Sequence, residues 1–346
     1  MEGRIIGVKR AAASAPKSPV KPAARLAPHP SAAAVRHLAV DDEDAGQRLD
    51  NFLLRQLKGV PKTHVYRVIR SGEVRVNGGR AGADTRVQPG DSVRVPPMRL
   101  GDAQRTVAAP AREFPLLLED DHLLAVDKPA GVAVHGGSGV AFGVIEQLRQ
   151  ARPAARFLEL VHRLDRETSG VLLLAKKRSA LTALQAQFRA RGTTKTYQAL
   201  VRGHWPLRLK LIDLPLHKGL DSAGERHVRV VMDDHAEARR SITRVRAMQV
   251  CADFSLLELA LETGRTHQIR VHLAHHGHPI AGDPRYGDFE LNRALARGDL
   301  LRGTRFGRMF LHARELAFDH PSDGRRVTLQ APLPADCATL LSRLCP

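Results

Sequence analysis

The chain has 346 residues and 43% of them are hydrophobic, which is enough to build separate cores in two domains. No apolar run approaches the roughly 18 to 20 residues that cross a bilayer, and the first residues lack the apolar segment of a signal peptide, so we expect a soluble cytoplasmic protein. The formal net charge of +18 predicts an extended polyanionic partner. Nucleic acid fits better than an anionic membrane, because the chain lacks a basic amphipathic helix with bulky apolar anchors.

The first 36 residues differ in composition from the rest of the chain. Residues 1–36 are rich in Ala, Pro and Ser and carry seven Lys or Arg against one acid. They have no helical or strand periodicity and cannot bury enough apolar surface to offset chain entropy. We expect a disordered basic arm that holds RNA non-specifically by charge, and an organellar transit peptide is the alternative.

Residues 37–96 predict a small domain of two helices and short strands. The first helix is expected at 48–54, and the second at 61–71, where Pro61 starts it and Gly72 ends it. Alternation at 74–78 and 91–96 predicts strands, the first of which enters a tight turn. The second helix should turn Val65, Val68 and Ile69 towards a core and leave Arg67 and Arg70 pointing elsewhere.

A Pro- and Ala-containing linker is expected at 97–113, followed by a single domain of the α+β class at 114–346. The strands of this domain are predicted at 121–127, 157–164, 170–176, 194–203, 254–263 and 327–331. Its helices are predicted at 139–151, 178–191 and 268–275.

The most informative stretch runs from Val161 to Gly170 and contains Asp165 between Arg163 and Arg166. Apolar segments lie on both sides of it and are typical of strands, so the carboxylate is expected on a rigid frame, where functional groups are often found. We therefore interpret Asp165 as a positioned, ionised nucleophile. The alternative is an Asp that caps a surface turn.

Neither cysteines nor histidines form a convincing metal site. Cys251, Cys337 and Cys345 are odd in number and lack metal-ligand spacing, so we expect neither a zinc site nor a disulfide framework. The histidines at 267–278 include an i, i+4 pair, but no HExxH pattern or partner Cys accompanies them, which favours packing and phosphate contacts. No phosphate-cradling or dinucleotide-binding loop is present, and we expect no cofactor.

Four ordered blocks resemble the RluA/RluC/RluD family of RNA pseudouridine synthases. They are Asp127–Gly131, Val161–Gly170, Lys195–Val201 and Leu261–His272, and Gly282–Gly287 follows at the expected distance. The resemblance covers the chain from about residue 40 to the C-terminus. It implies an α+β catalytic domain with a mixed, largely antiparallel central sheet.

The resemblance also assigns roles to individual residues. It implies that Asp165 is the catalytic residue, that Arg270 is the buried cation paired with it, and that Tyr197 stacks on the flipped uracil and takes part in proton transfer. Arg163 matches the position that fills the gap left in the RNA. Sugar-directed routes are favoured, in which Asp165 attacks the anomeric carbon or abstracts a ribose proton to give a glycal, and a base-directed route stays open.

The basic segment at 48–75 holds seven Lys or Arg against two acids. Its helix-helix-strand order resembles the S4 RNA-binding domain, which implies a grip on structured RNA. The residues expected to contact RNA there are Arg48, Lys62, Arg67, Arg70 and Arg75.

The segments at 55–62 and 133–139 look closest to the RluC branch of the family, which acts on large-subunit ribosomal RNA. We therefore expect an isomerase that acts as a monomer and converts uridine to pseudouridine in 23S ribosomal RNA or its precursor. One alternative is a synthase for transfer RNA or other ribosomal positions. Others are a non-catalytic RNA-binding ribosome assembly factor and a glycosylase that releases uracil.

Overall fold

The computed structural model describes residues 34–57, 60–98, 109–137, 140–220, 226–232, 234–251, 253–300 and 303–345. Apart from its last three residues, the arm predicted for 1–36 lies outside these ranges, and so do residues 99–108 of the predicted linker. The chain divides into two compact units. The N-terminal unit includes residues 34–40 and 46–98, and the C-terminal unit includes residues 41–45 and 109–345.

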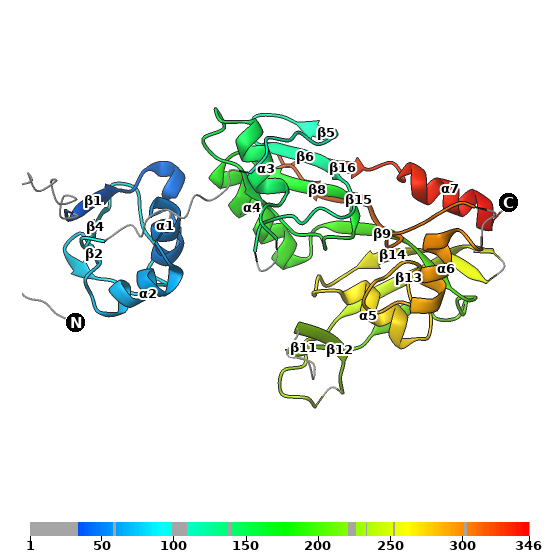
Figure 1. The fold of residues 1–346 in the computed structure, drawn as a ribbon. Helices are drawn as coiled ribbons and strands as arrows, with labels where there is room; N and C mark the ends of the chain where they lie inside the picture. Colours follow the sequence, from blue (N-terminus) through cyan, green and yellow to red (C-terminus); the bar gives the residue numbers. More distant parts are fainter. Residues whose placement is uncertain are drawn as a thin grey trace, which may run out of the picture. The chain divides into compact units, whose positions relative to one another are not determined.

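The N-terminal unit packs two helices on a four-stranded antiparallel sheet with the order β1-β4-β2-β3 (Figure 1). Its elements are β1 (Arg36–Ala39), α1 (Leu49–Gln56), α2 (Lys62–Arg70), β2 (Arg75–Val76), β3 (Gly79–Arg80) and β4 (Ser92–Val95), and a short 3₁₀ helix, η1 (Asp42–Asp44), precedes α1 in sequence. The tight turn after β2 is confirmed, because Asn77 and Gly78 adopt φ angles of 49° and 78°. The predicted face of α2 is also confirmed: Val65, Val68 and Ile69 are buried, and Arg67 and Arg70 are exposed.

The C-terminal unit is built on a ten-stranded, largely antiparallel sheet, and this confirms the predicted α+β class. The order along the sheet is β10-β13-β14-β9-β15-β8-β6-β5, with β16 beside β15 and β7 beside β8. The strands are β5 (Leu116–Glu119), β6 (Leu123–Lys128), β7 (Glu159–Leu160), β8 (Ser169–Ala175), β9 (Thr194–Arg202), β10 (Leu211–Asp213), β13 (Ile242–Cys251), β14 (Phe254–Leu261), β15 (Leu311–Asp319) and β16 (Arg326–Gln330). The helices are α3 (Val144–Ala151), α4 (Arg178–Ala190), α5 (Gln268–His275), α6 (Phe289–Arg297) and α7 (Ala335–Leu344).

Strand β8 is the most deeply buried strand of this unit, because apolar clusters cover both of its faces. Leu172 and Leu174 belong to the cluster that α3 completes, and Val171 and Leu173 belong to the cluster that α4 completes. This alternation is the period of two that a strand imposes on its side chains. The turn that contains Asp165 leads directly into β8, so the site starts from the rigid centre of the sheet.

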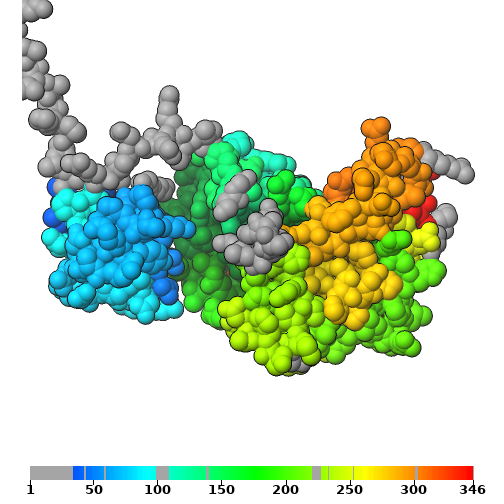
Figure 2. All heavy atoms as spheres, turned by 60° about the horizontal axis from the view of Figure 1, so that its bottom comes forward, coloured from blue at the N-terminus to red at the C-terminus, as the bar shows by residue number. Residues whose placement is uncertain are grey.

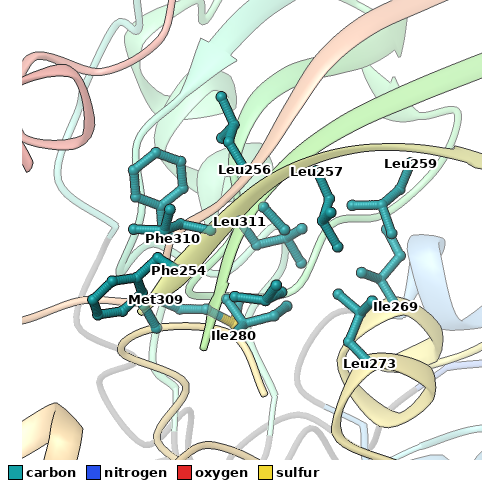
Figure 3. Close-up of a cluster of buried hydrophobic side chains, with 14 of the residues drawn as sticks. Phe254, Leu256, Leu257, Leu259, Ile269, Leu273, Ile280, Met309, Phe310 and Leu311 are labelled. Atoms are coloured by element: carbon teal, nitrogen blue, oxygen red, sulfur yellow. The ribbon is translucent and has the colours of Figure 1, made fainter. Parts of the chain in front are cut away.

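Helix α5 is fixed at the other half of the sheet. Figure 3 shows Ile269 and Leu273 of α5 beside Leu257 and Leu259 of β14, and all four are buried in one cluster. Next to α5 lies a hairpin of β11 (Leu216–Leu220) and β12 (Arg226–Val230), visible as the yellow-green surface beside the yellow of α5 (Figure 2). None of the helices in the described part of the chain has the length and apolar character that crossing a membrane requires.

The strand predicted for 157–164 was wrong for most of its length, because only β7 pairs with β8. The apolar side chains that suggested a strand are instead buried in the two clusters around β8, and they are Phe157, Leu158, Val161 and Leu164. The apolar residues of 157–164 therefore indicate burial and not strand pairing. As a result Asp165 lies in a turn and not at the end of a strand.

The expectation of no disulfide was also wrong. The structure joins Cys251 at the end of β13 to Cys345 just after α7, with Cα atoms 5.0 Å apart. Because the two cysteines are 94 residues apart, no local sequence pattern indicates the bond. Cys337 is free and buried.

Gly170 offers a test of how closely β8 and β15 must approach. Its φ is +112°, and a Cβ at this position would lie 2.1 Å from the backbone oxygen of Ala313. We expect Gly170→Ala to lower the free energy of unfolding of the C-terminal unit by about 3 kcal/mol or more, because both backbone strain and overlap are introduced. Urea denaturation followed by the fluorescence of Trp205, the single tryptophan, measures this change.

Gly307→Ala is the matched control, because a Cβ there meets nothing within 4 Å and the backbone is not in the left-handed region. It should change the free energy of unfolding by less than about 1 kcal/mol. Equal stability of the two variants would contradict the close approach at Gly170.

Candidate active site

Asp165 lies in a turn that is closed by a backbone hydrogen bond. The N–H of Thr168 donates to the backbone oxygen of Asp165 at 3.1 Å. Leu164, the residue before it, is buried in the cluster on the α3 side and anchors the turn. The Asp165 side chain is 19% exposed and lines a pocket. The carboxylate is therefore recessed but can be reached by a ligand.

Arg270 of α5 connects two carboxylates. Its Nη1 donates to Asp165 Oδ2 at 3.1 Å, while Nε and Nη2 donate to the two oxygens of Asp283 at 2.7 and 2.8 Å. Burial would lower the pKa of Arg270, but the hydrogen bonds and charge of Asp283, with the charge of Asp165, outweigh it and raise the pKa. Arg270 is therefore charged near neutral pH.

Asp283, which the sequence did not single out, is fully buried behind Arg270. Its Oδ1 also accepts the backbone N–H groups of Arg285 and Tyr286, at 2.8 and 3.0 Å. Burial would raise the pKa of Asp283, but the hydrogen bonds and charge of Arg270 hold it below the usual range. Asp283 therefore fixes the position of Arg270, and Arg270 in turn reaches Asp165.

Tyr197 of β9 lines the same pocket as Asp165 and Arg270, so the three predicted catalytic residues come together. The cavity volume of this pocket is about 110 Å³. Burial raises the pKa of Tyr197 well above its ordinary value, and the negative charge of Asp165 adds to this effect. The phenol is neutral and its ring forms part of the pocket wall.

His267 is a further pocket residue, for which the sequence predicted packing or phosphate contacts and no catalytic role. It precedes α5 in a left-handed conformation with φ +53°, unusual for a residue other than glycine. Its Nδ1 lies 2.9 Å from the Tyr286 hydroxyl, and its Nε2 lies 3.8 Å from Asp165 Oδ2. Burial lowers the pKa of His267, so the imidazole is neutral near pH 7.

Lys128, the last residue of β6, joins the loop that follows it to the Asp165 turn. Its Nζ is fully buried and donates to the backbone oxygens of Pro129, Val132 and Arg166 at 2.9, 2.7 and 3.1 Å. These acceptors use all three donors of an ammonium group. Burial lowers the pKa of Lys128 to about 7. The residue shapes the loop beside the pocket.

The residues predicted to contact RNA lie on both units. Arg163 is exposed and lines the pocket beside Asp165. On the N-terminal unit, Lys62, Arg67 and Arg70 are exposed on α2, whereas Arg75 is half-buried in β2. Arg48 donates to both oxygens of the buried Asp50, so its guanidinium has a structural partner as well as an exposed edge. Among the described residues, no group of three or more His, Cys, Asp or Glu is placed to hold a metal ion.

Comparison with known proteins gives consistent matches over both units. The family model of RNA pseudouridylate synthases matches residues 122–275, and the S4 domain model matches residues 47–93. Ribosomal large subunit pseudouridine synthase C of Escherichia coli (strain K12) is 48% identical over 316 residues, which are 90% of this chain and 97% of that protein. The protein of the same name from Vibrio cholerae is 45% identical over 320 residues, again 90% and 97%.

Among solved structures, human RNA pseudouridylate synthase domain containing 4 matches with a TM-score of 0.54 and 28% identity. The match covers 66% of this chain and 92% of the human chain.

The buried pair of Arg270 and Asp283 leads to a stability prediction. Asp283→Asn leaves the guanidinium with one carboxylate instead of two, and we expect the free energy of unfolding to fall by about 3 kcal/mol at pH 7. Because the folded pKa of Asp283 is lowered, its contribution is present above the ordinary Asp pKa of about 3.9 and is lost as the pH falls through the folded value. The difference between wild type and variant should therefore shrink below about pH 4. Calorimetric unfolding at pH 7 and pH 3.5 measures both differences.

Asp336→Asn is the matched control, because Asp336 also receives two hydrogen bonds from one arginine, Arg308, but is half exposed. Its effect should stay below about 1 kcal/mol. Equal losses in the two variants would contradict the structural role of Asp283.

Proposed function

The chain belongs to the RNA pseudouridylate synthase family, and we propose that it converts uridine to pseudouridine at specific positions of large-subunit (23S) ribosomal RNA or its precursor. The observation that carries the proposal is the 48% identity to ribosomal large subunit pseudouridine synthase C over 97% of that protein. The Asp165–Arg270 pair in a pocket gives the chain a site suited to the reaction.

The reaction breaks the C–N glycosidic bond, turns the uracil and joins it to the ribose through carbon. It transfers no electrons to or from a second molecule, so the proposal needs no cofactor. Asp165 acts at the anomeric carbon, where a carboxylate stabilises or traps the positive charge that develops. Arg270 donates a hydrogen bond to Asp165 and holds it directed into the pocket, and the neutral ring of Tyr197 stacks on the uracil.

A recessed carboxylate can meet a uridine of structured RNA only after the nucleotide leaves its stack. Arg163 is exposed beside Asp165 and has a planar guanidinium that can occupy the vacated space or bind phosphate. We propose that the enzyme acts as a monomer. Ribosomal RNA as substrate assigns the enzyme to the cytoplasm.

The last step requires a base, because the C5–H bond must break after C5 has joined the ribose. Its electron pair restores the double bond of the ring, and a nearby group receives the proton. Tyr197 is a poor acceptor because its hydroxyl is already protonated. His267 is neutral, and when its Nδ1–H donates to Tyr286, the Nε2 lone pair faces Asp165 and the pocket. We therefore assign the proton to His267 Nε2.

Complementation of a strain that lacks the gene tests the target and the nucleophile together. Wild-type protein should restore specific pseudouridines in 23S ribosomal RNA, and Asp165→Asn should restore none, because its rate falls more than about a thousandfold. The RNA affinity of Asp165→Asn should stay within roughly tenfold, about 1.4 kcal/mol, since the lost group acts on bond-making. Pseudouridine mapping of total RNA and filter binding measure the two effects.

Glu159→Gln is the control, because Glu159 pairs with Arg149 and lines neither of the pockets that contain Asp165. It should restore modification. Pseudouridines that depend on the gene only in transfer RNA would refute the ribosomal target, free uracil would indicate a glycosylase, and full activity of Asp165→Asn would refute the nucleophile.

His267→Gln tests the proton acceptor. With RNA that carries deuterium at C5 of uridine, the variant should be about a hundredfold slower and its isotope effect should increase, because C5 deprotonation becomes limiting. The wild-type rate should fall only as the pH drops below 6.5, since the pKa of His267 is lowered, and the variant should lack this limb. Groups that face His267 are Asp165, Arg270, Arg285, Asp283 and Tyr286.

His275→Gln is the control on the same helix, because its side chain is exposed and the pocket does not include it. A slower His267→Gln enzyme with an unchanged isotope effect would assign His267 a purely structural role.

A further inference from the structure

The N-terminal unit exposes an aromatic ring on α2. Tyr66 is 37% exposed, whereas Phe52, the other Phe, Trp or Tyr among the described residues of this unit, is fully buried. A tyrosine on an RNA-binding surface offers a face on which a base can stack. From the surroundings of this ring we propose that the N-terminal unit binds one unpaired nucleobase of the RNA, with Tyr66 as the stacking surface.

The Tyr66 ring is held in a fixed orientation. Its hydroxyl donates to Asp50 Oδ2 at 3.0 Å, and Asp50 is 2% exposed. Arg48 donates to both oxygens of Asp50, at 3.1 and 2.7 Å, and the backbone N–H of Asn51 donates at 2.8 Å. The three bonds from Arg48 and Asn51 fix the carboxylate, and the carboxylate fixes the ring. A preorganised ring loses little entropy when a base stacks on it.

The ring borders a depression that has room for a flat ligand. On the α2 side the depression is lined by Tyr66, Ile69 and Arg70. On the other side it is lined by Arg80 and the small residues Ala81, Gly82 and Ala83. The absence of large side chains in 81–83 keeps this side open beside the ring. The backbone there is fixed to α1, because Asp50 N–H donates to the Ala83 oxygen at 3.1 Å.

Positive charges flank the ring on both sides. Lys62, Tyr66 and Arg70 are spaced at i, i+4 and i+8 on α2, so they form one stripe, and all three are exposed. Arg80 comes from β3 and donates to the Arg70 backbone oxygen at 2.9 Å, which holds its guanidinium at the edge of the depression. A nucleotide stacked on the ring has a phosphate on either side of its base, and these cations lie where such phosphates would run.

The inference rests on the proposed function, because structured ribosomal RNA offers unpaired bases in its loops. It adds a contact of a different kind to the basic grip expected for the S4 domain. Stacking depends on the face of the base and little on salt, whereas a phosphate contact depends on ionic strength. The salt dependence of RNA binding therefore distinguishes a stacked base from a phosphate contact.

Full-length variants are tested for binding to 23S ribosomal RNA transcribed in vitro, by filter binding at several salt concentrations. Tyr66→Leu should bind about tenfold more weakly with an unchanged salt dependence, since one stacked base is lost. Tyr66→Phe should stay within about twofold of wild type, because the ring remains. Arg70→Gln should both weaken binding and lower the slope of the salt dependence by about one.

Phe289→Leu is the matched control, because Phe289 is an aromatic that is 56% exposed on the C-terminal unit. It should bind like wild type, and thermal unfolding should confirm that every variant is folded. Photocrosslinking of RNA that contains 5-bromouridine should yield an adduct on the tryptic peptide Thr63–Arg67. Wild-type affinity of Tyr66→Leu, or an equal loss in Tyr66→Phe and Tyr66→Leu, would overturn the proposal.

Failure of this inference can be told apart from failure of the proposed function. With saturating enzyme, the single-turnover rate of pseudouridine formation by the wild-type protein tests the proposed function independently of Tyr66, because the residues of the Asp165 pocket all belong to the C-terminal unit. A wild-type enzyme that binds the transcript but forms no pseudouridine would refute the ribosomal target and leave the stacking result standing.

Discussion

A single guanidinium shared between two carboxylates determines the geometry of the pocket. Arg270 is 6% exposed, so removing its charge from water costs several kcal/mol unless hydrogen bonds and opposite charges replace the lost hydration. Asp283 supplies most of this compensation with two short bonds, and only the remaining Nη1 reaches Asp165. Because Asp283 holds the guanidinium in place, Asp165 can stay partly exposed and available to a ligand.

The sheet makes this arrangement possible by joining segments that are far apart in sequence. Asp165 and Arg270 are 105 residues apart, and they meet because the turn before β8 and the start of α5 lie at the same side of the central strands. Two sets of contacts with the backbone hold the turn in place. Gly170 lets β8 approach β15 closely, and the three carbonyl bonds of Lys128 fix the loop after β6 to the turn. The position of Asp165 is thus set by backbone contacts and does not depend on its own side chain.

The sequence was sufficient to find the residues of the pocket but not all of their partners. Asp165, Tyr197 and Arg270 were found because each lies in a family-like motif, and their catalytic roles stay predictions. Asp283 lies in the segment Gly282–Gly287, but no role was predicted for it. An ion pair depends on distance in the folded protein and not on spacing along the sequence. Strands β13 and β15 were missed for a related reason. Each contains a bulge, between Ala247 and Gln249 or between Ala313 and Glu315, and a bulge breaks the alternation by which a strand is recognised.

Negative side chains lie inside the pocket and positive side chains lie at its exposed rim. This arrangement affects how a polyanion such as RNA can approach a carboxylate. Asp165 and Asp283 carry two negative charges against the single positive charge of Arg270, so this buried group is net negative and repels phosphate. Arg163 and Arg265 are exposed, and both line the pocket. Positive charges at the mouth attract the phosphates of an approaching RNA, while the carboxylates inside face the nucleotide that enters. The same separation explains why the net charge of +18 is compatible with an acidic reaction centre.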